Sequence, residues 1–465
     1  MASPFIFCFS ICFSSFLILP GKISATHQEF QATTNFLNVS HDLRLLTNTT
    51  SLTWPLYSIP ATNSSSFLIN ALARQPNATA ASKTKAAANR AAFSYDDVAL
   101  MTEVMVGNPP QKQKMVLDTG SELSWLHCKT GRNPSSSLNP TRSVSYAPIP
   151  CNSPLCTAKT RDFPIPTSCD AKRLCHFTYT YADGTDVEGN LGRDFISLPA
   201  LKIRGFVFGC SSSAPVAETP GLMGLNRGSL SLISQLSTTH KFSYCITDRV
   251  VSPGSAGVLL FGDSPFAKYL HYTPLLTISI PLPYFNRAAY SVRLEGIKVG
   301  NKLLPIRKSV FLPDHTGAGQ TMIDSGTQFT LLLGEAYTAL KQEFVQQNRG
   351  RMSPMRENAG FQGPLDLCYD LPASTAGFPQ VTPVTLLFNS AQLTLDSHQL
   401  LYRVPKSGAR ISRGRAIYCF TFGNSDLVPV EANIIGNHHQ QNLWIEYDLQ
   451  NSRLGFARAR CNAKY

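Results

Sequence analysis

The chain has 465 residues, of which 43% are hydrophobic and 15% charged, and its formal net charge is +12. A chain of this length and hydrophobic content can bury a large core, and two lobes are expected. The charge does not indicate nucleic-acid binding, because the densest basic stretch lacks interleaved aromatic residues; it comprises Lys406, Arg410, Arg413 and Arg415.

Residues 1–25 are predicted to be a secretory signal peptide. An apolar stretch from Phe5 to Leu19 leads to small residues at Ser24 and Ala25. A signal anchor is the alternative, but about 15 apolar residues fall short of the roughly 20 that span a bilayer. We expect entry into the secretory pathway and no stable membrane span after signal removal. Residence in the endoplasmic reticulum, the vacuole or the cell wall stays open.

Residues 26–92 are predicted to be a removable, glycosylated prosegment. Their composition shifts to Ser, Thr, Ala and Asn with almost no acid. They also contain the N-glycosylation sequons of the chain, at Asn38, Asn48, Asn63 and Asn77. A merely disordered N-terminal extension is the alternative.

The remainder divides into a predicted N-terminal lobe, 93–265, and a C-terminal lobe, 266–465. Short strand-like runs dominate both, among them Phe177 to Tyr181 and Trp444 to Tyr447. The best helical signal is Gly334 to Gln347, which has apolar residues at helical spacing. The predicted fold class is mostly β.

Each lobe contains one copy of the same motif. Asp118 and Asp324 each follow a hydrophobic run and precede a Thr/Ser-Gly-Ser/Thr turn. Burying a carboxylate at the end of an apolar strand costs several kcal/mol unless something pairs with it, and the natural partner is the other carboxylate. Two like charges a few ångströms apart cannot both ionise, so the pair would share one proton.

The doubled motif resembles the pepsin-type (family A1) aspartic endopeptidases. The resemblance implies a bilobal double-β-barrel fold with the catalytic cleft between the lobes and Asp118 and Asp324 as catalytic residues. Supporting roles follow for the turn residues Thr119, Gly120, Ser121, Ser325, Gly326 and Thr327. An apolar-apolar-glycine element after each half-site ends at Gly224 or Gly436, where a second strand passes too close for a side chain.

A flap hairpin is implied by the same resemblance. Tyr181, Asp183, Gly184 and Thr185 match the flap that closes over substrate, and Trp125 matches the indole that supports the flap tyrosine. The resemblance further implies a water held between the two aspartates, activity at acidic pH and an extended peptide or protein substrate. We expect a monomer without a metal or other cofactor.

Ten cysteines follow the predicted signal, and an even number in a secreted chain argues for disulfides. Four of them lie close together in sequence, at Cys151, Cys156, Cys169 and Cys175, a spacing that could also bind zinc. In an oxidising compartment a disulfide-linked loop is favoured over a zinc site. This insertion resembles the nepenthesin-like plant group, and the half-site resembles the promotion-of-cell-survival type. Family precedent implies the pairs Cys151–Cys175, Cys156–Cys169, Cys128–Cys210, Cys245–Cys461 and Cys368–Cys419.

His438 and His439 are a second possible metal site. Neighbouring residues on a strand point to opposite faces, so a structural role is favoured over a shared metal. Two function classes remain open, an active endopeptidase and a protease-like binding or inhibitor protein of the xylanase-inhibitor kind. The enzyme is favoured because both acids, both glycines and the flap tyrosine are present.

Overall fold

The computed structural model describes residues 37–38, 52–58, 100–129, 137–182, 185–198, 201–213, 221–236, 239–248, 257–356, 365–373, 378–404 and 414–461. The predicted signal peptide lies outside these residues. So do most of the predicted prosegment, the sequons at Asn48, Asn63 and Asn77, and the flap residues Asp183 and Gly184. The description concerns the unit 36–465.

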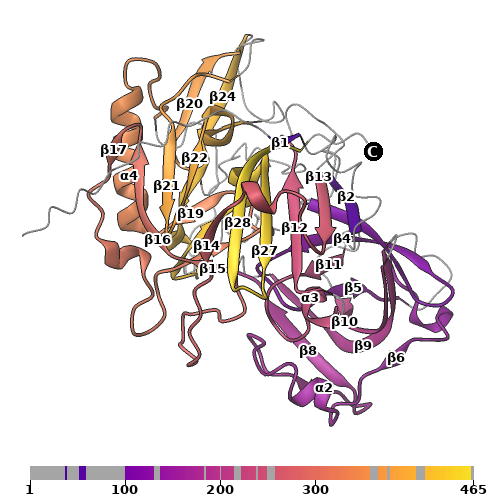
Figure 1. The fold of residues 1–465 in the computed structure, drawn as a ribbon. Helices are drawn as coiled ribbons and strands as arrows, with labels where there is room; N and C mark the ends of the chain where they lie inside the picture. Colours follow the sequence, from indigo (N-terminus) through magenta and orange to yellow (C-terminus); the bar gives the residue numbers. More distant parts are fainter. Residues whose placement is uncertain are drawn as a thin grey trace, which may run out of the picture. The chain divides into compact units, whose positions relative to one another are not determined.

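Strands dominate the described residues, which confirms the mostly β prediction (Figure 1). Six strands close into a barrel because β9 pairs with β3 as well as with β10. In chain-pairing order they are β3 (Leu100–Val106), β4 (Gln111–Asp118), β11 (Gly221–Gly224), β5 (Trp125–His127), β10 (Leu201–Ser213) and β9 (Asp186–Leu198). β8 (Cys175–Thr180) extends this sheet, and its strict alternation of buried and half-buried residues reflects the period of two in a strand.

The same sheet continues into strands from both halves of the chain. β12 (Lys241–Ile246) pairs with β13 (Gly257–Phe261) on one side and with β27 (Leu443–Asp448) on the other, and β27 pairs with β28 (Arg453–Arg460). Figure 1 shows these C-terminal strands, drawn in yellow, beside β12. The end of the chain is therefore built into the same sheet as β12, about two hundred residues earlier in sequence.

Two strands of this sheet lie within the predicted prosegment. β2 (Leu52–Ser58) pairs with β13 and β3, and β1 (Leu37–Asn38) pairs with β28. β1 includes the backbone of the sequon residue Asn38. Removal of residues 26–92 would therefore take backbone hydrogen-bond partners away from β13 and β28.

The C-terminal half contains three smaller sheets. The first orders β15 (Ser291–Val292), β18 (Gln320–Ile323), β26 (Ala432–Ile435), β19 (Thr330–Leu332) and β25 (Phe422–Asn424). The second orders β17 (Lys302–Leu303), β16 (Leu294–Val299), β21 (Val384–Phe388) and β22 (Ala391–Leu395), and the third β20 (Cys368–Pro372), β24 (Arg415–Phe420) and β23 (Leu401–Arg403). The predicted helix is α4 (Gly334–Asn348), which buries Tyr337, Leu340 and Phe344.

The remaining elements are short. The strands are β6 (Ala147–Pro148), β7 (Ser168–Cys169) and β14 (His271–Pro274), and the α-helices are α2 (Pro154–Thr157), α3 (Leu232–Gln235) and α5 (Ser397–Leu400). The 3₁₀ helices are η3 (Pro140–Arg142), η4 (Ala267–Tyr269), η5 (Lys308–Phe311), η6 (Ser425–Leu427) and η7 (Asn437–Gln440). Across the described ranges no helix combines the length and apolar character needed to cross a bilayer.

Three disulfides join the expected cysteines, Cys128–Cys210, Cys245–Cys461 and Cys368–Cys419. The two in the cysteine-rich insertion are exchanged relative to the expectation, so the predicted pairs Cys151–Cys175 and Cys156–Cys169 are wrong. The structure joins Cys151 to Cys169 and Cys156 to Cys175.

Burial explains this exchange. Cys169 and Cys175 lie opposite each other in the β7–β8 ladder, but Cys175 is fully buried and Cys169 is exposed. Helix α2 directs Cys156, 2% exposed, into the same small core as Cys175. Cys151, 9% exposed, belongs to the same core, and its partner Cys169 is the one exposed cysteine of the four.

Candidate active site

The two half-sites have the same local architecture. β4 ends at Asp118 and pairs in parallel with β11, so that Gly224 lies opposite Asp118, and β5 pairs antiparallel with β11. In the second half β18 ends just before Asp324 and pairs in parallel with β26, which β19 joins antiparallel. The sequence repeat is therefore also a structural repeat.

Gly224 and Gly436, at the end of the second strand of each half-site, lie too close to neighbouring backbone for a side chain to fit. A Cβ on Gly436 would lie 2.5 Å from the carbonyl oxygens of Gln328 and Phe329. A Cβ on Gly224 would overlap the backbone of Glu122, within 3.0 Å of Leu123 N. Because backbone atoms cannot move aside as a side chain can, only glycine fits at either place.

The carboxylates face each other across the two turns. A Cβ on Gly120 would lie 2.8 Å from Asp324 Oδ1, and a Cβ on Gly326 would overlap Asp118 Oδ1. Each glycine thus packs against the carboxylate of the opposite half-site. The structure therefore brings Asp118 and Asp324 together, although they are 206 residues apart in sequence. The neighbouring residues Thr119 and Ser325 have the same separation and are also in contact.

Thr119 and Ser325 join the two turns by reciprocal hydrogen bonds. The Thr119 amide donates to Ser325 Oγ at 3.1 Å, and the Ser325 amide donates to Thr119 Oγ1 at 2.9 Å. The hydroxyls in turn donate to the carbonyl oxygens of Ile323 and Leu117, at 3.3 and 3.0 Å. Both residues are at most 1% exposed, so these bonds are sheltered from water.

Each carboxylate accepts a hydrogen bond from its own turn. The amides of Gly120 and Gly326 donate to Oδ1 of Asp118 and Asp324, both at 2.8 Å. Thr327 Oγ1 donates to Asp324 Oδ2 at 2.6 Å. The matching hydroxyl of Ser121 is buried and favours the charged form of Asp118, although no hydrogen bond of standard geometry joins the two groups.

Burial and mutual repulsion change the acidity of this pair. Asp118 is 6% exposed. Its burial, reinforced by the nearby charge of Asp324, raises the pKa of Asp118 far above the usual range of a carboxyl. The pair therefore retains a proton at pH values where isolated aspartates have lost theirs.

The predicted flap residues lie beside the first half-site. Trp125 Nε1 donates to the Tyr181 hydroxyl at 2.7 Å, and the Tyr181 amide donates to the Thr185 carbonyl at 2.9 Å, which closes the hairpin. The neighbouring ring of Tyr179 lies 5.2 Å from that of Tyr181, and its hydroxyl accepts from the Glu122 amide at 3.3 Å. The hairpin is thus connected to the turn that carries Asp118.

Glu122 is a buried acid near the site that the sequence analysis missed. It is 2% exposed, and its Oε1 accepts from the Leu230 amide at 2.8 Å. Burial raises the pKa of Glu122 to about 7, against the opposing effect of that hydrogen bond. One sequence signal could have identified it, an acid inside the otherwise uncharged run from Ser121 to Trp125.

Arg227 connects the two halves of the chain next to the site, and it too was missed. Its amide donates to the Ala288 carbonyl at 2.8 Å, and its Nη2 donates to the carbonyls of Ala289 and Arg287 at 2.7 and 3.0 Å. Burial lowers the pKa of Arg227. These three hydrogen bonds to backbone carbonyls hold the segment around residue 288 next to the first half-site.

The prediction that His438 and His439 lie on a strand is wrong, because both belong to η7. The His439 ring contacts the hydroxyls of Thr330 and Thr421, the latter at 2.8 Å. Full burial lowers the pKa of His439 far below its usual value and keeps the ring neutral. Within the described residues no group of three potential metal-ligating side chains is found.

Similar proteins are known. Residues 101–263 match the family model described as Xylanase inhibitor N-terminal, and residues 289–458 match Xylanase inhibitor C-terminal. The chain is 49% identical to the aspartic proteinase PCS1 of Arabidopsis thaliana over 384 residues, covering 79% of this chain and 83% of that protein. It is 32% identical to the aspartic proteinase nepenthesin-1 of Nepenthes gracilis over 374 residues, covering 78% of each chain.

Solved structures share the fold. The crystal structure of edgp superposes with a TM-score of 0.62 at 19% identity, covering 88% of this chain and 95% of that one. Basic 7S globulin from soybean superposes with a TM-score of 0.60 at 17% identity, covering 89% and 98%. Identities this low establish the common fold only.

Proposed function

Because this chain belongs to the nepenthesin-like plant aspartic proteinases, and is thereby an aspartic-type endopeptidase, we propose that Asp118 and Asp324 hydrolyse peptide bonds by activating a shared water. The observation that carries this proposal is the mutual packing of the two half-sites, in which each turn glycine lies against the opposite carboxylate. Two carboxylates so close cannot both be charged, and a singly protonated pair supplies one base and one acid.

The chemistry follows from that single proton. The ionised carboxylate takes a proton from the water, which attacks the carbonyl carbon of the substrate. The protonated carboxylate donates its proton to the developing oxyanion. The tetrahedral intermediate then collapses as a proton reaches the leaving nitrogen, and the pair returns to its singly protonated form.

Acidic operation is part of the proposal. Asp118 is the group whose pKa is raised, by burial and by the charge of Asp324. Activity falls at high pH when the pair loses its last proton and no acid remains. It falls at low pH when both carboxyls are protonated and no base remains.

The flap and the substrate complete the proposal. In this proposal Tyr181, whose hydroxyl accepts from Trp125 Nε1 at 2.7 Å, covers an extended peptide that pairs with the flap backbone. The reaction requires no cofactor, since water and two carboxyl groups supply all transferred protons. Five disulfides among the described cysteines fit synthesis in the oxidising secretory pathway.

A second candidate function is a protease-like binding or inhibitor protein. The observation in its favour is the match of both halves to family models described as xylanase inhibitor domains. Against it, both aspartates and both turn glycines are present and packed together, and the tyrosine of the predicted flap is present as well. We therefore place the hydrolase first.

The test is cleavage of a denatured protein at about pH 3 to 5, where aspartic dyads operate. Asp118→Asn keeps the size of the side chain and removes the titrating group, so we expect loss of nearly all activity. Asp370→Asn is the matched control, because this carboxylate is 42% exposed and pairs with Arg415 in the sheet of β20 and β24. Unchanged cleavage by Asp118→Asn would contradict the mechanism, and no cleavage by processed wild-type protein would favour the binding function.

A further inference from the structure

A buried polar cluster lies next to the two half-sites and has no part in the mechanism above. It consists of Tyr244 on β12, Tyr447 on β27 and Gln440 in η7. Their exposed fractions are 0%, 0% and 1%. Because a buried hydroxyl or amide without a partner costs several kcal/mol in an apolar core, three such groups require a specific set of hydrogen bonds.

Those bonds lead to the backbone of the second catalytic residue. Gln440 Nε2 donates to the Asp324 carbonyl at 3.0 Å and to the Ile435 carbonyl at 2.8 Å. Its Oε1 accepts from the Tyr244 hydroxyl, which also lies 2.8 Å from the Tyr447 hydroxyl. The side chain of Gln440 therefore connects the backbone carbonyl of Asp324 to Tyr244 on β12.

The same hydroxyls also approach the first half-site. Thr119 lies near both hydroxyls and acts to lower the pKa of Tyr244 and Tyr447, although no hydrogen bond of standard geometry joins it to either ring. The same threonine accepts from the Ser325 amide in the reciprocal bonds between the turns. The cluster thus lies beside the turn of Asp118 at Thr119 and bonds to the turn of Asp324 through Gln440.

The tyrosine rings are held in place by their neighbours. The ring of Tyr447 stacks on Phe242 at 4.4 Å with an interplanar angle of 3°, and the ring of Tyr290 lies 4.3 Å away. The Tyr290 hydroxyl donates to the Leu225 carbonyl at 2.6 Å. Rings packed on several sides cannot adopt other positions without opening the core.

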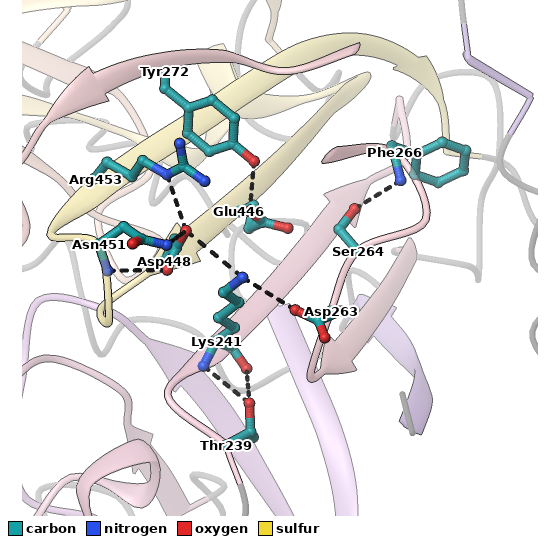
Figure 2. Close-up of polar contacts among 10 residues, drawn as sticks. All are labelled: Thr239, Lys241, Asp263, Ser264, Phe266, Tyr272, Glu446, Asp448, Asn451 and Arg453. Carbon is teal, nitrogen blue, oxygen red and sulfur yellow. Dashed lines mark hydrogen bonds and ion pairs between the residues drawn. The ribbon is translucent and has the colours of Figure 1, made fainter. Parts of the chain in front are cut away.

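Charged groups hold β27 from its other face. Glu446 and Asp448 flank Tyr447 in the strand and point to the opposite side of the sheet. Figure 2 shows their contacts: Asp448 binds Arg453 Nε at 2.9 Å and lies 3.7 Å from Lys241 Nζ, while the Tyr272 hydroxyl donates to Glu446 at 2.7 Å. Both faces of β27 thus resist a shift of Tyr447.

We propose that Gln440, Tyr244 and Tyr447 are positioning residues. They set the separation and orientation of Asp118 and Asp324 from the side of β12 and β27. This inference rests on the proposed function, since it assigns these residues to the same reaction. A cluster that only filled the core would satisfy its own hydrogen bonds. This one uses both hydrogen atoms of the Gln440 amide on main-chain carbonyls, one of them that of Asp324.

The test compares Tyr244→Phe and Gln440→Leu with Tyr369→Phe. Tyr369 is the matched control, because its hydroxyl is buried and has no hydrogen-bond partner among the described residues. We expect kcat to fall about tenfold in both cluster variants, as small misplacements of catalytic groups do, with KM changed less than about twofold. The upper limb of the pH profile of kcat should also move, because it reports the coupling of the two carboxyls. Tyr369→Phe should match wild type.

The outcomes separate the two proposals. If folded Tyr244→Phe and Gln440→Leu keep the kcat and pH profile of Tyr369→Phe, the positioning role is overturned while the hydrolase function stands. If the processed wild type has no activity, both proposals are overturned. Thermal melting of every variant identifies a general loss of folding, and Tyr447→Phe supplies a third test if one of the first two variants fails to fold.

Discussion

Thr119 and Ser325 each donate their backbone amide to the side-chain oxygen of the other, at 3.1 and 2.9 Å. This exchange joins two turns from different halves of the chain without using the carboxylate of Asp118 or Asp324. Because all four groups are buried, the loss of either hydroxyl leaves an amide without a partner. The bonds that set the geometry are therefore distinct from the groups that would carry the chemistry.

We first predict that Thr119→Val destabilises the fold. The substitution keeps the branched shape but removes the acceptor of the Ser325 amide, so the free energy of unfolding should fall by about 1–3 kcal/mol. Thr102→Val is the control, because the Thr102 hydroxyl is fully buried but has no partner in the described part of the chain. Urea unfolding measures both, and an equal effect of the two variants would contradict a specific role for this bond.

A second prediction concerns Glu122 and pH. Its pKa is raised by burial to about 7 in the folded protein, against about 4.3 in an unfolded chain. A raised pKa means that the folded state binds the proton more tightly. This contribution to stability is therefore complete below about pH 4.3 and is lost as the pH rises to about 7 and above.

The loss from Glu122 should amount to about 3 kcal/mol. The measurement is urea unfolding at several pH values between about 4 and 8. Both proteins should carry Asp118→Asn, which prevents self-digestion and removes the parallel contribution of that carboxyl. We expect Glu122→Gln to flatten the decrease of stability with pH. If stability falls with pH equally steeply in the protein that keeps Glu122 and in the Glu122→Gln variant, Glu122 is not the cause of the decrease.

A third prediction concerns the close approach at Gly436. Gly436→Ala places a Cβ against the carbonyl oxygens of Gln328 and Phe329, and overpacking of this kind costs about 1–3 kcal/mol. Gly350→Ala is the matched control, because no described atom lies within 4 Å of a Cβ built there. Thermal unfolding should show a lower Tm for the first variant alone. A normal Tm for Gly436→Ala would mean that β26 can shift without cost.

A fourth prediction concerns the cysteine-rich insertion. Proteolysis without reduction, followed by mass spectrometry, should recover peptides joined by Cys151–Cys169 and by Cys156–Cys175. Recovery of a Cys151–Cys175 peptide would contradict the structure. The sequence separations, 18 and 19 residues, predict similar entropic stabilisation of about 3 kcal/mol for each. Removing the Cys156–Cys175 pair should nevertheless destabilise more, because both of its cysteines are buried, whereas Cys169 of the other pair is exposed.

Much of the site was predictable because its signals are local in sequence. The doubled aspartate turns, the glycines that follow and the hairpin around Tyr181 are each short segments whose residue types have a direct physical reason. The strand prediction at His438 and His439 was wrong because a 3₁₀ turn follows Gly436 at once, and two polar residues carry no period that distinguishes the two structures. Glu122 was missed because its partner, Leu230, lies 108 residues away.

The sequence by itself determined the two half-sites, the mostly β class and which cysteines are available, since composition and short motifs decide these. Only the tertiary structure decided which carboxylate lies against which glycine, how Cys151 and Cys156 find their partners, and that Gln440 supports the backbone of Asp324 across 116 residues. These features depend on packing between segments far apart in the chain. A hydrogen bond acts over about 3 Å, so no short stretch of sequence can show which distant partner it will reach.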